Sequence, residues 1–167
     1  LLALAGAVGF TDGGKAIADA GVMRRALSYA NQFNRLVIQH PEEPSLAKDG
    51  QMNGGETATR LGLKGIPRLA EVIMIERDLR LVEMTGARYH VAHISTSEAV
   101  DAIRQAKARG LPVSCDTAPH YFSLTEMDVV DYRTFAKVSP PLRQDEDREA
   151  IVAGLADGTI DAIASDH

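Results

Sequence analysis

Short apolar runs alternate with amphipathic stretches along this chain. Apolar runs of about four to eight residues bounded by turn residues predict buried strands, whereas apolar residues spaced three or four apart predict helices. We therefore expect strands at residues 7–10, 36–40, 89–94, 112–117 and 160–164, and helices at residues 18–32, 67–85, 97–109 and 145–156.

Residues at the ends of these segments support the helix predictions. Pro67 suits the first turn of a helix, and Gly86 suits the C-cap of the same helix. Ser97 is expected near the N-cap of the following helix, which ends at Gly110. Residues 41–66 are rich in Pro, Gly and Asn, so we expect an irregular loop, and loops of this length are usually functional.

The alternation of strands and helices predicts an α/β fold with a parallel sheet covered by helices. An open doubly wound sheet and a barrel both fit the pattern, but no Gly-x-Gly-x-x-Gly follows any strand, which disfavours a dinucleotide-binding fold. About five βα units are too few to close an eight-stranded barrel. The chain opens with Leu1 rather than Met and stops just after an apolar run. We therefore interpret residues 1–167 as one partial (β/α)8 TIM barrel domain from a longer protein.

Composition narrows the class of function. The net charge is −5, and no basic block or basic-aromatic pattern suggests a nucleic-acid partner. No apolar run approaches the roughly 18–20 residues of a membrane span, so we expect no membrane association. Cys115 is the single cysteine, which excludes an internal disulfide and favours a reducing, cytoplasmic location. We expect Cys115 to be a buried, inert thiol and the partner to be a small-molecule substrate.

Polar residues follow the predicted strands. Because the carboxyl ends of parallel strands lie on one face, we expect these side chains to converge where barrel enzymes place their sites. Histidine and aspartate are suitable ligands for Zn²⁺. The pattern alone predicts a barrel metalloenzyme with candidate residues Asp12, His40, His93, His120 and Asp166.

Each candidate also has a structural interpretation. A lone histidine at a strand end is more often a hydrogen-bonded structural residue, Asp12 could be a turn residue, and Asp166 could cap a helix. Several such residues at the same ends of successive strands are much less expected by chance. His90 and His93 are three residues apart, so strand alternation places them on opposite faces. We expect His93 to be the ligand and His90 a supporting or packing residue.

Seven short phrases stand out along the chain. They are Gly-Ala-Val-Gly-Phe-Thr-Asp-Gly (6–13), Gln-His-Pro-Glu-Glu (39–43), Gly-Ile-Pro (65–67), Tyr-His-Val-Ala-His-Ile-Ser-Thr (89–96), Thr-Ala-Pro-His-Tyr-Phe (117–122), Lys-Val-Ser-Pro-Pro-Leu-Arg (137–143) and Ile-Ala-Ser-Asp-His (163–167). Taken in this order, they resemble the class I dihydroorotases of the amidohydrolase superfamily. The Gly-Ile-Pro and Pro-Pro-Leu-Arg phrases are closer to dihydroorotase than to hydantoinase or allantoinase.

The resemblance implies a zinc-dependent cyclic amidohydrolase that interconverts N-carbamoyl-L-aspartate and L-dihydroorotate in pyrimidine biosynthesis. It implies metal binding by His40 and His93, and both metal binding and proton transfer by Asp166. Ser139 matches a substrate-binding position. The family's His-x-His-x-Arg, which supplies further ligands, would precede Leu1.

Two departures from the family bear on the metal site. Gly13 occupies the position of the metal-bridging carboxylate, with Asp12 as its neighbour and a doubtful substitute, so the resemblance leaves one or two Zn²⁺ ions open. Ser139 replaces the usual Asn, and its side chain is shorter with fewer hydrogen-bonding groups. A related hydantoinase or allantoinase is one alternative. Another is a weak or inactive homologue that scaffolds aspartate transcarbamoylase. We expect a homo-oligomer for the dihydroorotase interpretation as well as for these alternatives.

Overall fold

The computed structural model describes residues 1–166, so the final residue of the phrase at 163–167 lies outside the described part. The main sheet has five parallel strands in the order β1-β2-β5-β6-β7. These strands confirm the predicted α/β class and the predicted strand positions, although most are shorter than expected. They are β1 (Gly9–Thr11), β2 (Leu36–Gln39), β5 (Tyr89–Val91), β6 (Val113–Thr117) and β7 (Ala162–Ile163).

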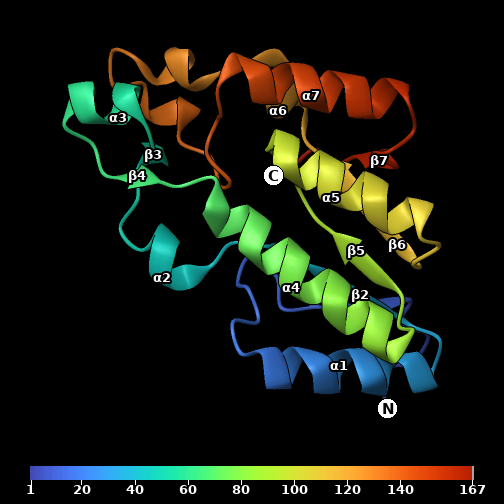
Figure 1. Cartoon of the computed structure of the whole chain (residues 1–167). Helices are drawn as coiled ribbons and strands as arrows, with labels where there is room; N and C mark the ends of the chain where they lie inside the picture. The colour runs from blue at the N-terminus through green and yellow to red at the C-terminus, as the bar shows by residue number, and fades with distance from the viewer. Residues whose placement is uncertain (167) are drawn as a thin grey trace.

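Long helices pack beside this sheet in chain order (Figure 1). Neighbouring strands along the chain are neighbours in the sheet, and each successive helix contacts the one before it. This is the arrangement of consecutive βα units in a (β/α)8 barrel. The helices are α1 (Ala20–Gln32), α4 (Leu69–Thr85), α5 (Ser97–Ala108) and α7 (Asp145–Ala156).

A continuous apolar core lies between these helices and the sheet. Leu27 of α1, Ile75 of α4 and Ile103 of α5 are fully buried and meet Val91 of β5 in one cluster. Burial of each such side chain contributes roughly 1.5–3 kcal/mol to stability. This core holds the strand ends in fixed positions.

Helix ends largely follow the sequence signals. Gly86 adopts a left-handed φ of 65° directly after α4, which confirms the predicted C-cap. The N-cap residue of α5 is Thr96, whose hydroxyl accepts from the Ala99 amide, so Ser97 is the first helical residue rather than the cap. Pro67 precedes α4, whose N-cap residue is Arg68.

The expectation that residues 41–66 form an irregular loop is wrong. This segment folds into two short helices and a pair of parallel two-residue strands, which Figure 1 shows gathered at one side of the molecule. Elements this short span too few residues to produce a periodic pattern. They are α2 (Pro44–Ala47), β3 (Met52–Asn53), α3 (Glu56–Leu61) and β4 (Gly65–Ile66).

A second apolar cluster joins this segment to the chain between β6 and α7. Met52 and Ala58 pack there with Tyr121, Val129 and Leu142. The chain between β6 and α7 contains α6 (Pro119–Ser123) and the 3₁₀ helices η1 (Glu126–Val129) and η2 (Thr134–Ala136).

A buried polar network reinforces the same junction. The Arg143 guanidinium donates to Ser95 Oγ at 3.0 Å and to Asn53 Oδ1 at 2.9 Å, and its Nη2 lies 3.6 Å from Glu71 Oε2. Asn53 in turn donates to Glu126 Oε2 at 2.6 Å. Because Ser95 follows β5 and Arg143 follows the Ser-Pro-Pro-Leu phrase, the network ties those two segments together.

Over residues 1–166, the model contains no helix that combines the length and the apolar character required to span a bilayer.

Candidate active site

A cavity of about 420 Å³ opens at the carboxyl ends of the main-sheet strands. Its position matches the face where parallel α/β barrels place their active sites. All of its lining residues except Ser139 lie in the last two residues of a strand or within three residues after one. The lining residues are Thr11, Gly13, Gly14, Ile38, His40, Ala92, His93, Asp116, Ser139 and Asp166.

The structure brings His40, His93 and Asp166 together in this cavity. His40 follows β2, and its ring centroid lies 6.0 Å from that of His93, two residues beyond β5. His93 Nε2 lies 3.3 Å from Asp166 Oδ1. Burial lowers the pKa of the His40 imidazole, which favours the neutral form that can bind a metal ion. The predicted convergence of these three residues is confirmed.

The backbone at two of these positions is in the left-handed region. His93 has a φ of 57° and Asp166 a φ of 55°. Such a conformation costs a non-glycine residue roughly 1–3 kcal/mol, and residues of this kind are enriched at functional sites. At His93 the backbone N–H donates to Asp116 Oδ1 at 2.8 Å, which helps to hold the conformation.

Asp116, in β6, is a site residue that the sequence analysis missed. Its Oδ2 lies 2.7 Å from His90 Nε2, and its Oδ1 lies 3.0 Å from His93 Nδ1. Burial opposes ionisation of Asp116, but the contacts with the two histidines outweigh it and hold the pKa of the carboxyl well below its usual range. The same carboxylate raises the pKa of His93, although burial opposes that shift. The cavity lining includes His93 but not His90, in agreement with the supporting role expected for His90.

Ser139 lies at the rim of the cavity, beside His40. Its Oγ is 3.4 Å from His40 Nε2 and 3.4 Å from Glu42 Oε2. Glu42, in the Gln-His-Pro-Glu-Glu phrase, is a second neighbour that the sequence analysis did not single out. His120 approaches from α6, with its Nε2 3.7 Å from Asp166 Oδ2, so it also joins the predicted group.

Asp12 is not brought to the histidines. It is exposed and lines a separate apolar cavity together with Phe10, Ile17 and Tyr29. Gly13, the next residue, lines the candidate active site instead, with a φ of 69° and no atom within 4 Å of where a Cβ would stand. A turn of the chain between residues 12 and 13 therefore directs Asp12 away, and a metal-binding role for Asp12 stays a prediction without structural support.

The site fits part of a zinc-binding set. Two imidazoles and a carboxylate are chemically suitable ligands, and the buried His120 Nε2 makes no hydrogen bond in the described structure. Within residues 1–166, however, no group of three His, Cys, Asp or Glu side chains is arranged to hold an ion. The described residues supply ligands of the right kind without forming a complete site.

Comparison with known proteins agrees with this chemistry. A dihydroorotase from Desulfotalea psychrophila is 57% identical over 98% of this chain and 39% of its own length, and one from Syntrophobacter fumaroxidans is 55% identical over 97% and 37%. The chain therefore spans about two fifths of the length of these relatives.

Solved structures of related enzymes share the fold. An L-hydantoinase (dihydropyrimidinase) from Arthrobacter aurescens matches 98% of this chain and 38% of its own, with a TM-score of 0.81 and 27% identity. A D-hydantoinase matches the whole chain and 39% of its own, with a TM-score of 0.83 and 23% identity, which shows the fold alone. A family model described as dihydro-orotase-like matches residues 1–99, more than half of the sequence. The chain belongs to the dihydroorotase-like family.

Proposed function

We propose that this chain is part of a zinc-dependent dihydroorotase. The enzyme would add water to L-dihydroorotate to give N-carbamoyl-L-aspartate, and would catalyse the reverse ring closure in pyrimidine biosynthesis. The observation that best supports this function is the meeting of His40, His93 and Asp166 in one cavity, within a chain of the dihydroorotase-like family. The single, buried Cys115 is consistent with a cytoplasmic enzyme.

In this proposal His40 and His93 hold zinc through their neutral imidazoles, and Asp166 lies beside them. Zinc, when bound, would lower the pKa of a water molecule from about 15.7 toward about 7 and would polarise the substrate carbonyl. The remaining ligands would come from parts of the protein that correspond to the rest of its relatives' length. Because Gly13 supplies no side chain at the bridging position, we propose one zinc ion rather than two.

Asp166 would act as the general base and then as the general acid. Its carboxylate would accept a proton from the attacking water and return it to the ring nitrogen as the C–N bond breaks. Asp166 Oδ1 lies 3.3 Å from His93 Nε2 and Asp166 lines the cavity, so its carboxylate would lie close both to an ion held by His93 and to a bound substrate. Ser139, at the rim, would bind the substrate through its hydroxyl.

Zinc content and dihydroorotate hydrolysis of the intact protein test this proposal. We expect bound zinc, hydrolysis of dihydroorotate, and a loss of about 10²–10⁴-fold in kcat in Asp166→Asn, because general acid–base catalysis typically contributes that much. Near-normal turnover of Asp166→Asn would show that the catalytic assignment is wrong. Preference for a hydantoin or for allantoin over dihydroorotate would place the enzyme with its hydantoinase neighbours instead.

A second candidate function follows from Gly13. A homologue that lacks the bridging carboxylate could have lost catalysis and could serve as a structural partner of aspartate transcarbamoylase. Absence of both zinc and turnover in the intact protein, together with binding to aspartate transcarbamoylase, would favour this function.

A further inference from the structure

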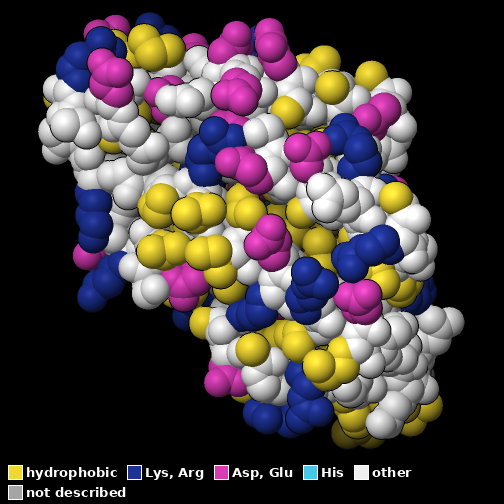
Figure 2. All heavy atoms as spheres, viewed as in Figure 1, with side chains coloured by type: hydrophobic (Ala, Val, Ile, Leu, Met, Phe, Trp, Pro, Cys, Tyr) yellow, Lys and Arg dark blue, Asp and Glu magenta, His cyan; other side chains and the backbone are white. Residues whose placement is uncertain are grey.

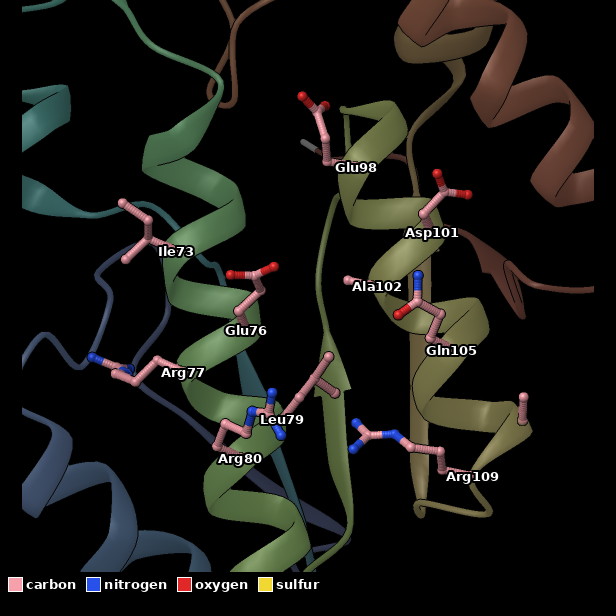
Figure 3. A pocket seen from close by; sticks show the side chains of 11 residues that line it. Ile73, Glu76, Arg77, Leu79, Arg80, Glu98, Asp101, Ala102, Gln105 and Arg109 are labelled. Atoms are coloured by element: carbon pink, nitrogen blue, oxygen red, sulfur yellow. The ribbon is translucent and has the colours of Figure 1, made fainter.

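One arginine of the outer helix layer reaches through to a loop at the candidate active site. Arg77 of α4 borders a groove of about 890 Å³ between α4 and α5, and Figure 3 shows its side chain extending away from α5. None of the described histidines is visible on the outer face of these helices in Figure 2, so the candidate active site does not open on that face. The polar end of Arg77 instead meets the part of the chain that precedes α1.

This part of the chain is the β1–α1 loop, residues 12–19. Its Gly13 and Gly14 line the candidate active site, and residues 12–15 are all exposed. In the described structure, no residue other than their chain neighbours comes within 4 Å of where a Cβ would stand at either glycine. Glycine leaves the backbone free to adopt many conformations. The exposed part of the loop therefore needs support from elsewhere to keep a fixed position.

Ile17 is the point at which the β1–α1 loop is held. Its side chain is partly buried and packs against the main apolar cluster. Its amide donates to Gln39 Oε1 at 2.8 Å, and its carbonyl accepts from Arg77 Nη2 at 2.9 Å. Arg77 Nη1 also donates to the Ala18 carbonyl at 2.6 Å. Hydrogen bonds to two side chains therefore hold the end of the loop that leads into α1.

Gln39 links this anchor to the end of β2. Ile38 and His40, on either side of it, line the cavity, so strand alternation turns the Gln39 side chain toward the helix layer, where it is buried. There Gln39 Nε2 donates to Asp78 Oδ2. A buried amide is costly unless it is hydrogen-bonded, and Asp78 and Ile17 satisfy its donor and its acceptor.

Asp78 holds Arg77 in the orientation that the loop requires. The Asp78 side chain is fully buried, and its Oδ1 accepts from Arg77 Nε at 2.9 Å and from Arg77 Nη2 at 2.7 Å. Its Oδ2 accepts from the Tyr89 hydroxyl at 2.7 Å as well as from Gln39. A guanidinium is planar and its donors form a fixed fork. The pair with Asp78 therefore directs the other N–H groups of Arg77 at the loop carbonyls.

We propose that Arg77, Asp78 and Gln39 are positioning residues that fix the β1–α1 loop as one wall of the cavity in which the substrate binds. None of the three is among the described residues that line the cavity, so each acts through the loop. The role of the loop as a substrate wall rests on the proposed function, whereas its attachment does not. Release of the loop should weaken substrate binding more than turnover, because the candidate zinc ligands and Asp166 follow other strands.

Limited trypsin digestion of the intact protein tests the attachment of the loop. Lys15 is the one basic residue of the loop and is exposed, so the rate of cleavage after it reports how often the loop leaves its anchor. Arg77→Met should speed this cleavage by about tenfold or more, because it removes charge-assisted hydrogen bonds to the loop. Arg77→Lys keeps the charge but not the planar fork, so its cleavage rate should be intermediate. Arg80→Met is the matched control, because Arg80 lies on the same helix and contacts Glu83 rather than the loop.

A double variant separates release of the loop from loss of stability. Arg77→Met leaves Asp78 buried without its cation, so Arg77→Met/Asp78→Asn should recover most of the lost urea midpoint. It should nevertheless remain sensitive to cleavage after Lys15. In the same double variant the KM for dihydroorotate should rise about tenfold while kcat changes by less than about threefold, which is the result expected for lost binding.

Unchanged cleavage after Lys15 in both Arg77→Met and the double variant would overturn the proposal. So would cleavage that accelerates equally at basic residues throughout the chain, which would indicate general unfolding, or a loss of kcat without a change in KM. If the wild type does not hydrolyse dihydroorotate, the proposed function fails, and cleavage after Lys15 still decides whether the loop is anchored by Arg77.

Discussion

At the scale of single residues, two of the candidate site residues also have an unusual backbone conformation. His93 and Asp166 both hold a left-handed φ that a non-glycine residue rarely adopts. His93 retains it while its amide donates to Asp116, a carboxylate that also contacts its ring. One acidic side chain therefore fixes both the backbone and the ring of a candidate zinc ligand.

Gly13 is the residue whose replacement gives the most direct information about metal number. Gly13→Asp should raise the zinc content of the intact protein from about one to about two ions per chain, because a carboxylate there could bridge a metal pair. No atom lies within 4 Å of the added Cβ, although the φ of 69° makes the substitution moderately unfavourable.

Elemental analysis of the purified variant would measure this change. Gly6→Asp is the control, because this glycine also has a positive φ and open space around a Cβ but does not line the cavity, so the change should give no second ion. Two zinc ions in the wild type would contradict the one-metal proposal.

The Cys115 thiol should be chemically silent in the folded protein. Burial raises its pKa to about 12, so almost no thiolate exists near pH 8. We expect a thiol reagent such as dithionitrobenzoate to label the folded protein negligibly at pH 8 and to label it stoichiometrically in denaturing urea. Rapid labelling without denaturant would show that the thiol is not buried as described.

At the scale of elements, the Arg143 network joins parts of the chain that are distant in sequence. Arg143→Met would leave Glu71 buried without its cation, and breaking a buried pair in this way costs roughly 3–5 kcal/mol. Urea denaturation should therefore show a loss of about 3 kcal/mol in the free energy of unfolding.

A double variant separates the ion pair from simple loss of packing. Arg143→Met combined with Glu71→Gln should lose less than the sum of the two single variants, because the uncompensated charge is gone. Arg104→Met is the control at an exposed pair with Asp157, where surface ion pairs contribute only about 0–1 kcal/mol. Strict additivity of the two buried substitutions would argue against a coupled network.

Sequence patterns predicted the long elements well and the short ones poorly. The helix at 145–156 was predicted with its exact bounds, and the helix ending at Gly86 was predicted with its cap, because amphipathic spacing and glycine signals are local. β3 and β4 have two residues each, and their pairing depends on a close approach of the two backbones. Glycine at position 65 permits this approach, because a Cβ there would lie only 2.4 Å from Gly54 Cα. No local pattern encodes such a contact.

The residues of the candidate site were also predicted only in part. His40, His93 and Asp166 could be predicted because each follows a strand and matches a family phrase. Asp116 was missed because it lies inside β6 rather than after it, and because it acts through contacts with His90 and His93, which come from β5 and the residues after it. The sequence did not predict that Asp12 lies away from the histidines, because the backbone turn after β1 decides that residue 13, and not residue 12, lines the cavity.

At the scale of the whole molecule, acid should weaken the fold in part through Asp157. Hydrogen bonds from Thr159 and Arg104 lower the pKa of this carboxyl to about 2, below the roughly 3.9 of an unfolded aspartate. A lowered folded pKa stabilises the protein above about pH 4, and that stabilisation is lost as the pH falls toward about 2.

Asp157→Asn should therefore reduce the urea midpoint at pH 6. The urea midpoint of the variant should also differ less between pH 6 and pH 3 than that of the wild type. The effect should be small, because Asp157 is exposed and solvent screens its charge. An identical pH dependence in both proteins would show that Asp157 has the same pKa in the folded and unfolded states.

The order of the main sheet also bears on how the molecule can form during its synthesis. In this sheet β2, β5, β6 and β7 each pair with the main-sheet strand that is synthesised before them. During synthesis the sheet can therefore grow only at the edge formed by the most recent strand, and each new strand pairs with a strand that has already formed. Until the next strand arrives, that edge is open to pairing with another nascent chain. Slow translation between β6 and β7 would lengthen the exposure of β6, and ribosomes spaced closely on one message would bring such edges together.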